Sequence, residues 1–306
     1  MIERTSFVFH DIEHPAFLAH GAADGPKLSL IGGIHGCEYS SIAAVTRFMG
    51  ELDTAELAGT ITAVPVVSME SFRQRSPFVV PADRKNLNRS FPGSHDGTYT
   101  DVLARSIFEA LIEPADALID LHGGDQVEGL EPFAIYEASP VEQTAHGIAA
   151  AFNLPYVVRE EPKEDGLGGL TTSAAAAAGI PGVIAEAGGR GLLEDDATQM
   201  LADGVRNALR YLEMLPGPPE PPRSPQRQVG SFLWLRCEHE GWWDSAVAAG
   251  DEVAEGQLLG RVRNLWGDPL EEIPAPRDGA VLFITTSPAV AADGLLLGLG
   301  ADFVDL

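Results

Sequence analysis

The sequence contains few cysteines, few lysines and no long apolar run, and each shortage narrows what the protein can be. Its two cysteines, Cys37 and Cys237, lie far apart, which provides neither a disulfide framework nor a thiolate metal site. The first residues show no basic segment followed by an apolar core, and the longest stretch of small apolar residues, 174–185, is interrupted by Pro181. We therefore expect neither export nor a membrane span, and a reducing cytoplasm as the compartment.

Basic residues are scarce as well. The 306-residue chain has 20 Lys and Arg against 45 Asp and Glu, which gives a formal net charge of −25. A surface of this sign repels nucleic-acid phosphates and anionic lipid headgroups, so neither nucleic acid nor a membrane is an expected partner. Hydrophobic residues make up 45% of the chain, enough for one large domain and a smaller one.

Apolar runs alternate with segments of helical spacing between residues 28 and 215. This alternation predicts an α/β domain with a mixed, mostly parallel sheet flanked by helices. The predicted strands are residues 28–34, 61–67, 117–121, 156–158 and 183–185.

A proline-rich segment, PGPPEPPRSP, follows this region, with six prolines in ten residues. Such a segment cannot carry a hydrogen-bonded helix or ladder, and we expect a stiff, extended spacer. The division predicted is a catalytic α/β domain over 1–215, a linker over 216–226 and a small all-β domain over 227–306, where short strand-like pieces alternate with glycine and proline turns.

Three metal-ligand residue types occur where predicted strands end. In LIGGIHGCEYSSIAA a strand gives way to His35 and Glu38, and in ALIDLHGGD another strand ends at His122. If these strands are neighbours, two imidazoles and one carboxylate converge, which is a common catalytic zinc set with one position left open. The alternative is two core or capping histidines and a helix N-terminal carboxylate. The coincidence of all three at strand ends favours the metal.

Glu186 follows a further apolar strand in IPGVIAEAGGRG. A carboxylate in that position is costly unless it is paired or used, and a glutamate beside a metal can accept the proton of a water that the metal has acidified. The alternative is a structural salt bridge, for example with Arg190. The loop DRKNLNRSFPG adds Asn88 and Arg89, an amide and a guanidinium fork that suit a substrate carboxylate.

Taken together, GGIHGCE, NLNRSFPG, DLHGGD and VIAEAGG, in this order, resemble the succinylglutamate desuccinylase/aspartoacylase family of zinc carboxypeptidase-like amidohydrolases. The resemblance covers the whole chain and implies a zinc carboxypeptidase-like sheet with a small barrel-sandwich-like C-terminal β domain. It implies one Zn²⁺ per chain. The roles it implies are metal ligation by His35, Glu38 and His122, water activation by Glu186, and a grip on the substrate carboxylate by Asn88 and Arg89.

An upstream arginine polarises the scissile carbonyl in such enzymes. Arg75 is our candidate; Arg73 and Arg84 compete for the role, and spacing does not decide between them. The chain departs from the family in having Cys37 between two ligands, for which packing is the expected role. No tyrosine follows Gln226, so the C-terminal substrate-binding tyrosine of aspartoacylases has no counterpart, which argues against N-acetylaspartate as substrate.

The C-terminal segments PAPRDGAV and AGDEVAEGQLLG resemble lipoyl- or biotinyl-type modules, which would suggest a carrier arm. All three lysines precede the proline-rich segment, so such a module has no lysine to modify. We expect this domain instead to pack over the mouth of the active site or to form a subunit contact.

The function predicted is that of a zinc-dependent hydrolase of the amide bond in a small N-acyl amino acid, of the N-acetyl or N-succinyl type. Two alternatives stay open: a carboxypeptidase-type peptidase, and a metal-binding or ligand-binding relative without turnover. The acyl group and the amino acid are left open, and a homo-oligomer is compatible with the sequence without being demanded by it.

Overall fold

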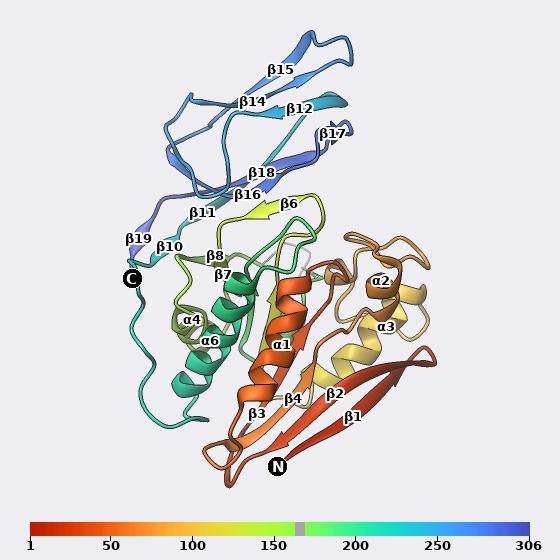
Figure 1. Ribbon diagram of the computed structural model, residues 1–306, viewed down its shortest axis with the longest axis vertical. Coiled ribbons are helices and arrows are strands. Elements are labelled where there is room, and N and C mark those ends of the chain that lie inside the picture. Colours follow the sequence, from red (N-terminus) through yellow and green to blue (C-terminus); the bar gives the residue numbers. More distant parts are fainter. Residues whose placement is uncertain (163–168) are drawn as a thin grey trace.

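The computed structural model describes residues 1–162 and 169–306 (Figure 1). A larger part with helices and strands lies below a smaller part made of strands, and the chain between them runs along the side of the larger part. Within the described residues, no helix is long and apolar enough to cross a membrane.

One ten-stranded sheet forms the centre of the larger part, within the described ranges. Its strands are β1 (Ile2–Phe9), β2 (Ile12–His20), β3 (Ala23–Gly32), β4 (Ala58–Val64), β5 (Ala117–His122), β7 (Phe133–Glu137), β8 (Tyr156–Glu160), β9 (Gly182–Glu186), β10 (Arg227–Val229) and β19 (Val304–Asp305). The order across the sheet is β1-β2-β4-β3-β5-β9-β7-β8-β10-β19. All five strands predicted from apolar runs are present here, as β3, β4, β5, β8 and β9.

The predicted mixed α/β character is confirmed. In the described residues the central strands β4, β3, β5 and β9 are parallel, and β7 with β8 and β8 with β10 also pair in parallel. Antiparallel pairs join β1 to β2, β2 to β4, β9 to β7 and β10 to β19. The carboxyl ends of three adjacent parallel strands, β3, β5 and β9, therefore meet at one edge.

Helices cover both faces of this sheet. They are α1 (Tyr39–Glu51), α2 (Met69–Gln74), η1 (Leu87–Arg89), α3 (Tyr99–Ile107), η2 (Phe108–Ile112), α4 (Glu142–Ala151), α5 (Thr171–Ala177) and α6 (Asp195–Tyr211). One buried cluster joins the sheet to α1, α4 and α6, where Phe48, Ile148 and Val205 are fully buried. A second cluster joins the opposite face to α3, η2 and α5. Burial of apolar side chains on both faces explains the nearly continuous apolar runs of the central strands.

The smaller part contains two further sheets. Its strands are β11 (Ser231–Arg236), β12 (Gly241–Ser245), β13 (Glu252–Val253), β14 (Leu258–Arg263), β15 (Pro269–Pro274), β16 (Gly279–Thr285), β17 (Ala289–Val290) and β18 (Leu295–Ala301). One sheet has the order β11-β18-β16-β13 and the other β15-β14-β12-β17. A separate buried cluster that includes Trp243, Leu259 and Leu297 fills the space between them.

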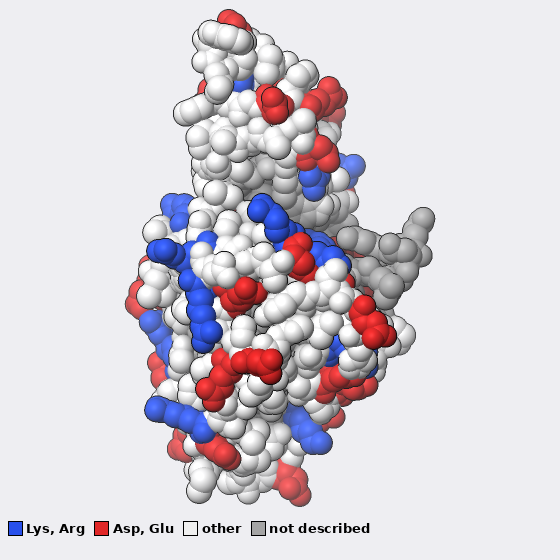
Figure 2. All heavy atoms as spheres, turned by 90° about the vertical axis from the view of Figure 1, so that its right-hand side faces the viewer, with Lys and Arg blue, Asp and Glu red and all other residues white. Residues whose placement is uncertain are grey.

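The two parts are connected by more than the chain between them. A strand of the larger part, β6 (Glu128–Leu130), pairs with β16, while β10 and β19 belong to the large sheet. The proline-rich segment contains no helix or strand, but Glu220 is held to Asn207 of α6 by hydrogen bonds in both directions. Figure 2 shows one face of the molecule, which narrows where the two parts meet and carries interspersed acidic and basic side chains.

Candidate metal centre

Three of the candidate side chains lie at the common edge of β3, β5 and β9. His35 lies in the turn after β3, His122 is the last residue of β5, and Glu186 is the last residue of β9. In the sheet His122 and Glu186 are direct neighbours. Gly33 makes the turn possible, because its φ is +62° and a Cβ there would lie 3.0 Å from the Cα of Val66.

His35, Glu38 and His122 converge as the sequence predicts. One ligand atom from each lies within 4.8 Å of the others. The Nδ1 of His35 is 2.6 Å from Oε1 of Glu38, and the Nδ1 of His122 is 3.1 Å from Oε2. Glu38 is the N-cap residue of α1 rather than part of its first turn, so the turn before the helix, not a helical face, brings His35 and Glu38 together.

Each imidazole is oriented by a second side chain. The Nε2 of His122 lies 3.0 Å from Oδ2 of Asp120, and that of His35 lies 3.1 Å from Oδ1 of Asn86. Both oxygens are hydrogen-bond acceptors. Asp120 offers a carboxylate oxygen, and the Asn86 Oδ1 also accepts the main-chain N–H of Asn88. The Nε2 atoms therefore carry the protons, and both Nδ1 atoms face the Glu38 carboxylate. A hydrogen bond from the second ring nitrogen to an acceptor side chain is typical of histidines that bind a metal.

The arrangement favours a positive charge at its centre. Burial alone would raise the pKa of Glu38, but the adjacent His35 and His122 outweigh it and bring the pKa to about 2. Burial would lower the pKa of His122, yet Asp120 and Glu38 raise it well above its usual value. Nδ1 atoms that face a carboxylate at these distances need a proton or a cation between them. Two imidazoles and a carboxylate fit zinc.

Glu186 is a carboxylate without a cationic partner among the described residues. Its pKa is raised to about 8, chiefly by burial, with repulsion from Glu38 and Glu128 added and the histidines acting in the opposite direction. The predicted alternative of a salt bridge to Arg190 does not form, because Arg190 pairs with Glu194 at 2.7 Å. A strongly perturbed, unpaired carboxylate beside a metal centre has the properties of a general base.

Asn88 and Arg89 lie in η1, next to the metal centre in space. Asn88 is buried, and its Oδ1 accepts the N–H of Thr171 at 3.1 Å, while its side-chain NH₂ donates to none of the residues that the structure describes. The exposed Arg89 folds back so that Nη1 donates to the main-chain oxygen of Asn88 at 2.6 Å. The two side chains therefore offer N–H donors from one short segment.

The three candidate arginines, Arg73, Arg75 and Arg84, are all exposed but differ in their surroundings. Arg75 ends α2 in a left-handed conformation with φ of 53°, and its main-chain oxygen accepts the side-chain N–H of Gln126 at 3.2 Å. Gln126 belongs to the loop that follows His122. Arg73 instead acts electrostatically on His14 of β2. These contacts bring the backbone of Arg75 against the loop of the metal centre.

Cys37 is fully buried, and its Sγ accepts a hydrogen bond from Gln126 Nε2 at 3.1 Å. In the part of the chain that the structure describes, Cys37 does not belong to the group of converging ligand atoms. The expected packing role therefore fits its position.

Sequence reasoning missed three polar residues of the site: Asn86, Asp120 and Glu128. For Asp120 a signal existed, because it is two residues before His122 in the same strand and so lies on the same face. Asn86 and Glu128 come from loops, where no periodicity indicates which side chains turn inward.

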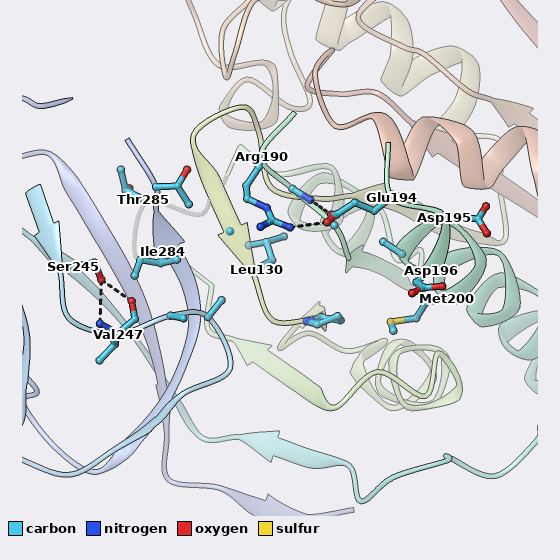
Figure 3. A pocket seen from close by; sticks show the side chains of 18 of the residues that line it. Leu130, Arg190, Glu194, Asp195, Asp196, Met200, Ser245, Val247, Ile284 and Thr285 are labelled. Carbon is cyan, nitrogen blue, oxygen red and sulfur yellow. Dashed lines mark hydrogen bonds and ion pairs between the residues drawn. The ribbon is translucent and has the colours of Figure 1, made fainter. Parts of the chain in front are cut away.

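A cavity of about 800 Å³ lies between the two parts of the molecule (Figure 3). Leu130, Arg190, Trp243 and Ile284 contribute to its walls, and Arg190 reaches across to Glu194. Among the described residues that line it, none is a candidate metal ligand. The cavity borders the loop that follows Glu186, through Gly188, Gly189 and Arg190.

Comparison with known proteins gives consistent matches. A sequence model of the succinylglutamate desuccinylase/aspartoacylase catalytic domain matches residues 24–212. The N-alpha-acetyl-L-2,4-diaminobutyric acid deacetylase of Halomonas elongata is 30% identical to this chain over 295 residues, which cover 92% of this chain and 84% of that protein.

Solved structures match over both parts of the molecule. The product-bound ectoine utilization protein EutE (DoeB) from Ruegeria pomeroyi is 26% identical, with a TM-score of 0.85 and coverage of 97% of this chain and 93% of that protein. The succinylglutamate desuccinylase/aspartoacylase from Rhodobacter sphaeroides also has a TM-score of 0.85, with coverage of 100% and 95%. Its identity of 22% supports the fold alone.

Proposed function

Because this chain belongs to the succinylglutamate desuccinylase/aspartoacylase family and is an N-acyl amino acid deacylase, we propose that it hydrolyses the amide of an Nα-acetylated diamino acid at a zinc site. The observation that carries the proposal is the convergence of His35, Glu38 and His122 on one point, with Glu186 beside them. The ligands proposed for one Zn²⁺ are these two histidines and Glu38.

Zinc at such a site lowers the pKa of water and polarises an acyl oxygen. The residues of the chain supply the rest. Glu186 accepts the proton of the attacking water and delivers it to the nitrogen that leaves, as a general base and then a general acid. Its burial and its lack of an ion pair in the described residues support this assignment.

Arg75 is proposed to donate hydrogen bonds to the acyl oxygen as negative charge develops there. Asn88 and Arg89 are proposed to hold the α-carboxylate, through the Asn88 NH₂ and the Arg89 guanidinium. Fixing this carboxylate would align the amide carbon with the water that attacks it.

The proposed substrate follows from the relatives. The curated relative is named for N-alpha-acetyl-L-2,4-diaminobutyric acid, and a structure of EutE (DoeB) matches nearly the whole chain. We therefore propose an acetyl group on the α-nitrogen and a second, free amine on the side chain. We further propose that residues 1–215 act as the catalytic domain and that the small β domain over 227–306 limits access to small substrates, with 216–226 as the linker.

The experiment is release of free amine from Nα-acetyl-L-2,4-diaminobutyrate, N-succinyl amino acids and N-acetylaspartate by zinc-loaded protein, beside a zinc-loaded Glu186→Gln variant. We expect release from the first compound, and a loss of about 10²- to 10⁴-fold in Glu186→Gln with its zinc content unchanged. A Glu186→Gln protein with near-normal rates would refute the mechanism, and preference for an N-succinyl compound would refute the acetyl assignment.

A further inference from the structure

Glu128 is held in place by both parts of the molecule. It is the first residue of β6 and pairs with Thr285 of β16 in the small β part. Its main-chain N–H donates to the oxygen of Asp125 at 3.0 Å, and its main-chain oxygen accepts the N–H of Arg190 at 2.8 Å. Arg190 is in the loop after Glu186. The backbone of Glu128 is thus fixed between the loops that follow His122 and Glu186.

The side chain of Glu128 lies against the loop that follows His122, because a Cβ at Gly124 would be only 3.1 Å from the Cβ of Glu128. Its Oε2 accepts the N–H of Asp125 at 2.9 Å, which ties it to the loop that follows His122. Its charge is repelled by Glu38 and Glu186 and attracted by His35, so it lies within electrostatic reach of the candidate ligands and the base. The residue keeps partial exposure, so a ligand can reach it.

This carboxylate forms no ion pair among the described residues, although His35 attracts it from a distance. Glu38, Glu128 and Glu186 are joined at this site by the buried Asp120 and Asp125, so the carboxylates outnumber the two charges that a divalent ion compensates. Burial and the neighbouring carboxylates raise the pKa of Glu128 to about 8, which shows that its charge is costly without a cation. The Glu128 carboxylate is therefore best satisfied by a positive charge from the substrate.

We propose that Glu128 is the specificity-determining residue that receives the side-chain ammonium of the diamino acid, a role that rests on the proposed function. The same carboxylate disfavours substrates with a second carboxylate, such as N-acetylaspartate, because two like charges would meet in a poorly solvated site. The mechanism proposed above leaves Glu128 unused, so its role lies in substrate choice and not in bond cleavage.

The test compares the Nα-acetyl derivatives of 2,4-diaminobutyrate, norvaline and glutamate. Their side chains are similar in length and are cationic, neutral and anionic, respectively. Glu128→Gln retains an oxygen for the Asp125 N–H and removes the charge. Glu131→Gln is the matched control, since Glu131 is a partly buried carboxylate whose pKa is raised by burial alone. Zinc content and the Kd of the product L-2,4-diaminobutyrate, from calorimetry, are measured for each protein.

Loss of a hydrogen bond to a charged group predicts that Glu128→Gln lowers kcat/KM for the diaminobutyrate compound by about 10- to 100-fold, mainly through KM. Product affinity falls in parallel, while the norvaline compound, the zinc content and Glu131→Gln stay as in the wild type. An unchanged preference for the cationic compound in Glu128→Gln, or equal losses on all three compounds, would overturn the inference. Wild-type protein that cleaves none of them would instead overturn the proposed function.

Discussion

The candidate site joins two halves that are built differently. The metal half, His35, Glu38 and His122, lies at strand ends, and each imidazole is held by a further side chain. The substrate half is Arg75 at the end of α2, with Asn88 and Arg89 in the short helix η1, and both arginines are exposed. The imidazoles of the metal half are held before any ligand arrives, whereas both guanidinium groups of the substrate half stay exposed to one.

The difference follows from burial. Glu38 and His122 are almost completely buried, so each polar atom there must have a partner or carry a large desolvation penalty. Exposed guanidinium groups have no such requirement, and loops on a rigid scaffold are where specificity is usually located. Substitutions in the metal half should therefore act on metal content, and those in the substrate half on KM or kcat with the metal retained.

The largest effect is expected for His122→Ala. Removal of one imidazole leaves two protein ligands, and Glu38 keeps only His35 as an imidazole partner, so we expect loss of bound zinc and a fall in turnover of more than about 10³-fold. Metal analysis and amine release measure the two effects, and the exposed His95→Ala is the control. One equivalent of zinc retained by His122→Ala would disprove the ligand assignment.

Arg75→Ala tests the substrate half. If Arg75 stabilises the developing charge on the acyl oxygen, kcat/KM should fall by about 10²- to 10³-fold with zinc content unchanged, as for other donors of this kind. Arg73→Ala is the matched control, because Arg73 lies on the same helix and acts on His14 instead. A larger loss in Arg73→Ala than in Arg75→Ala would reverse the assignment.

Asp120→Asn probes the support of the metal half. Asp120 accepts from both His122 Nε2 and the hydroxyl of Thr171, at 3.0 and 2.6 Å. An amide of the same shape holds the imidazole less firmly and makes it less basic, so zinc affinity should fall by about 10- to 100-fold. Competition with a chelator measures this. Unaltered affinity would mean that the imidazole needs no orienting carboxylate.

The sequence was sufficient to predict the strands that run through the core. The second half of β3, all of β5 and most of β9 are buried, so their residues are mostly apolar, and the candidate site residues mark where the apolar runs stop. β1 and β2 were not predicted, and their residues are largely exposed or half-buried. The position of β7 between β9 and β8 is a property of the whole sheet and has no local signal.

The same distinction applies to the site. His35, Glu38, His122 and Glu186 were predicted because strand ends concentrate ligands, and the structure brings them together. Glu128 could not be predicted, because its place depends on β6 pairing with a strand more than a hundred residues later in the chain. Contacts between residues so far apart in the sequence are seen only in the folded structure.

The smallest effect is expected for Arg89→Lys, and it separates the two halves most sharply. Lysine keeps the charge but lacks the planar fork that binds a carboxylate through two N–H groups, so we expect KM to rise about 10-fold with kcat little changed. Arg84→Lys, a nearby exposed arginine in a loop, should leave KM unaltered. Zinc content must stay at the wild-type value in both. If Arg89→Lys lowered the zinc content instead, Arg89 would support metal binding. The metal half and the substrate half would then not be independent.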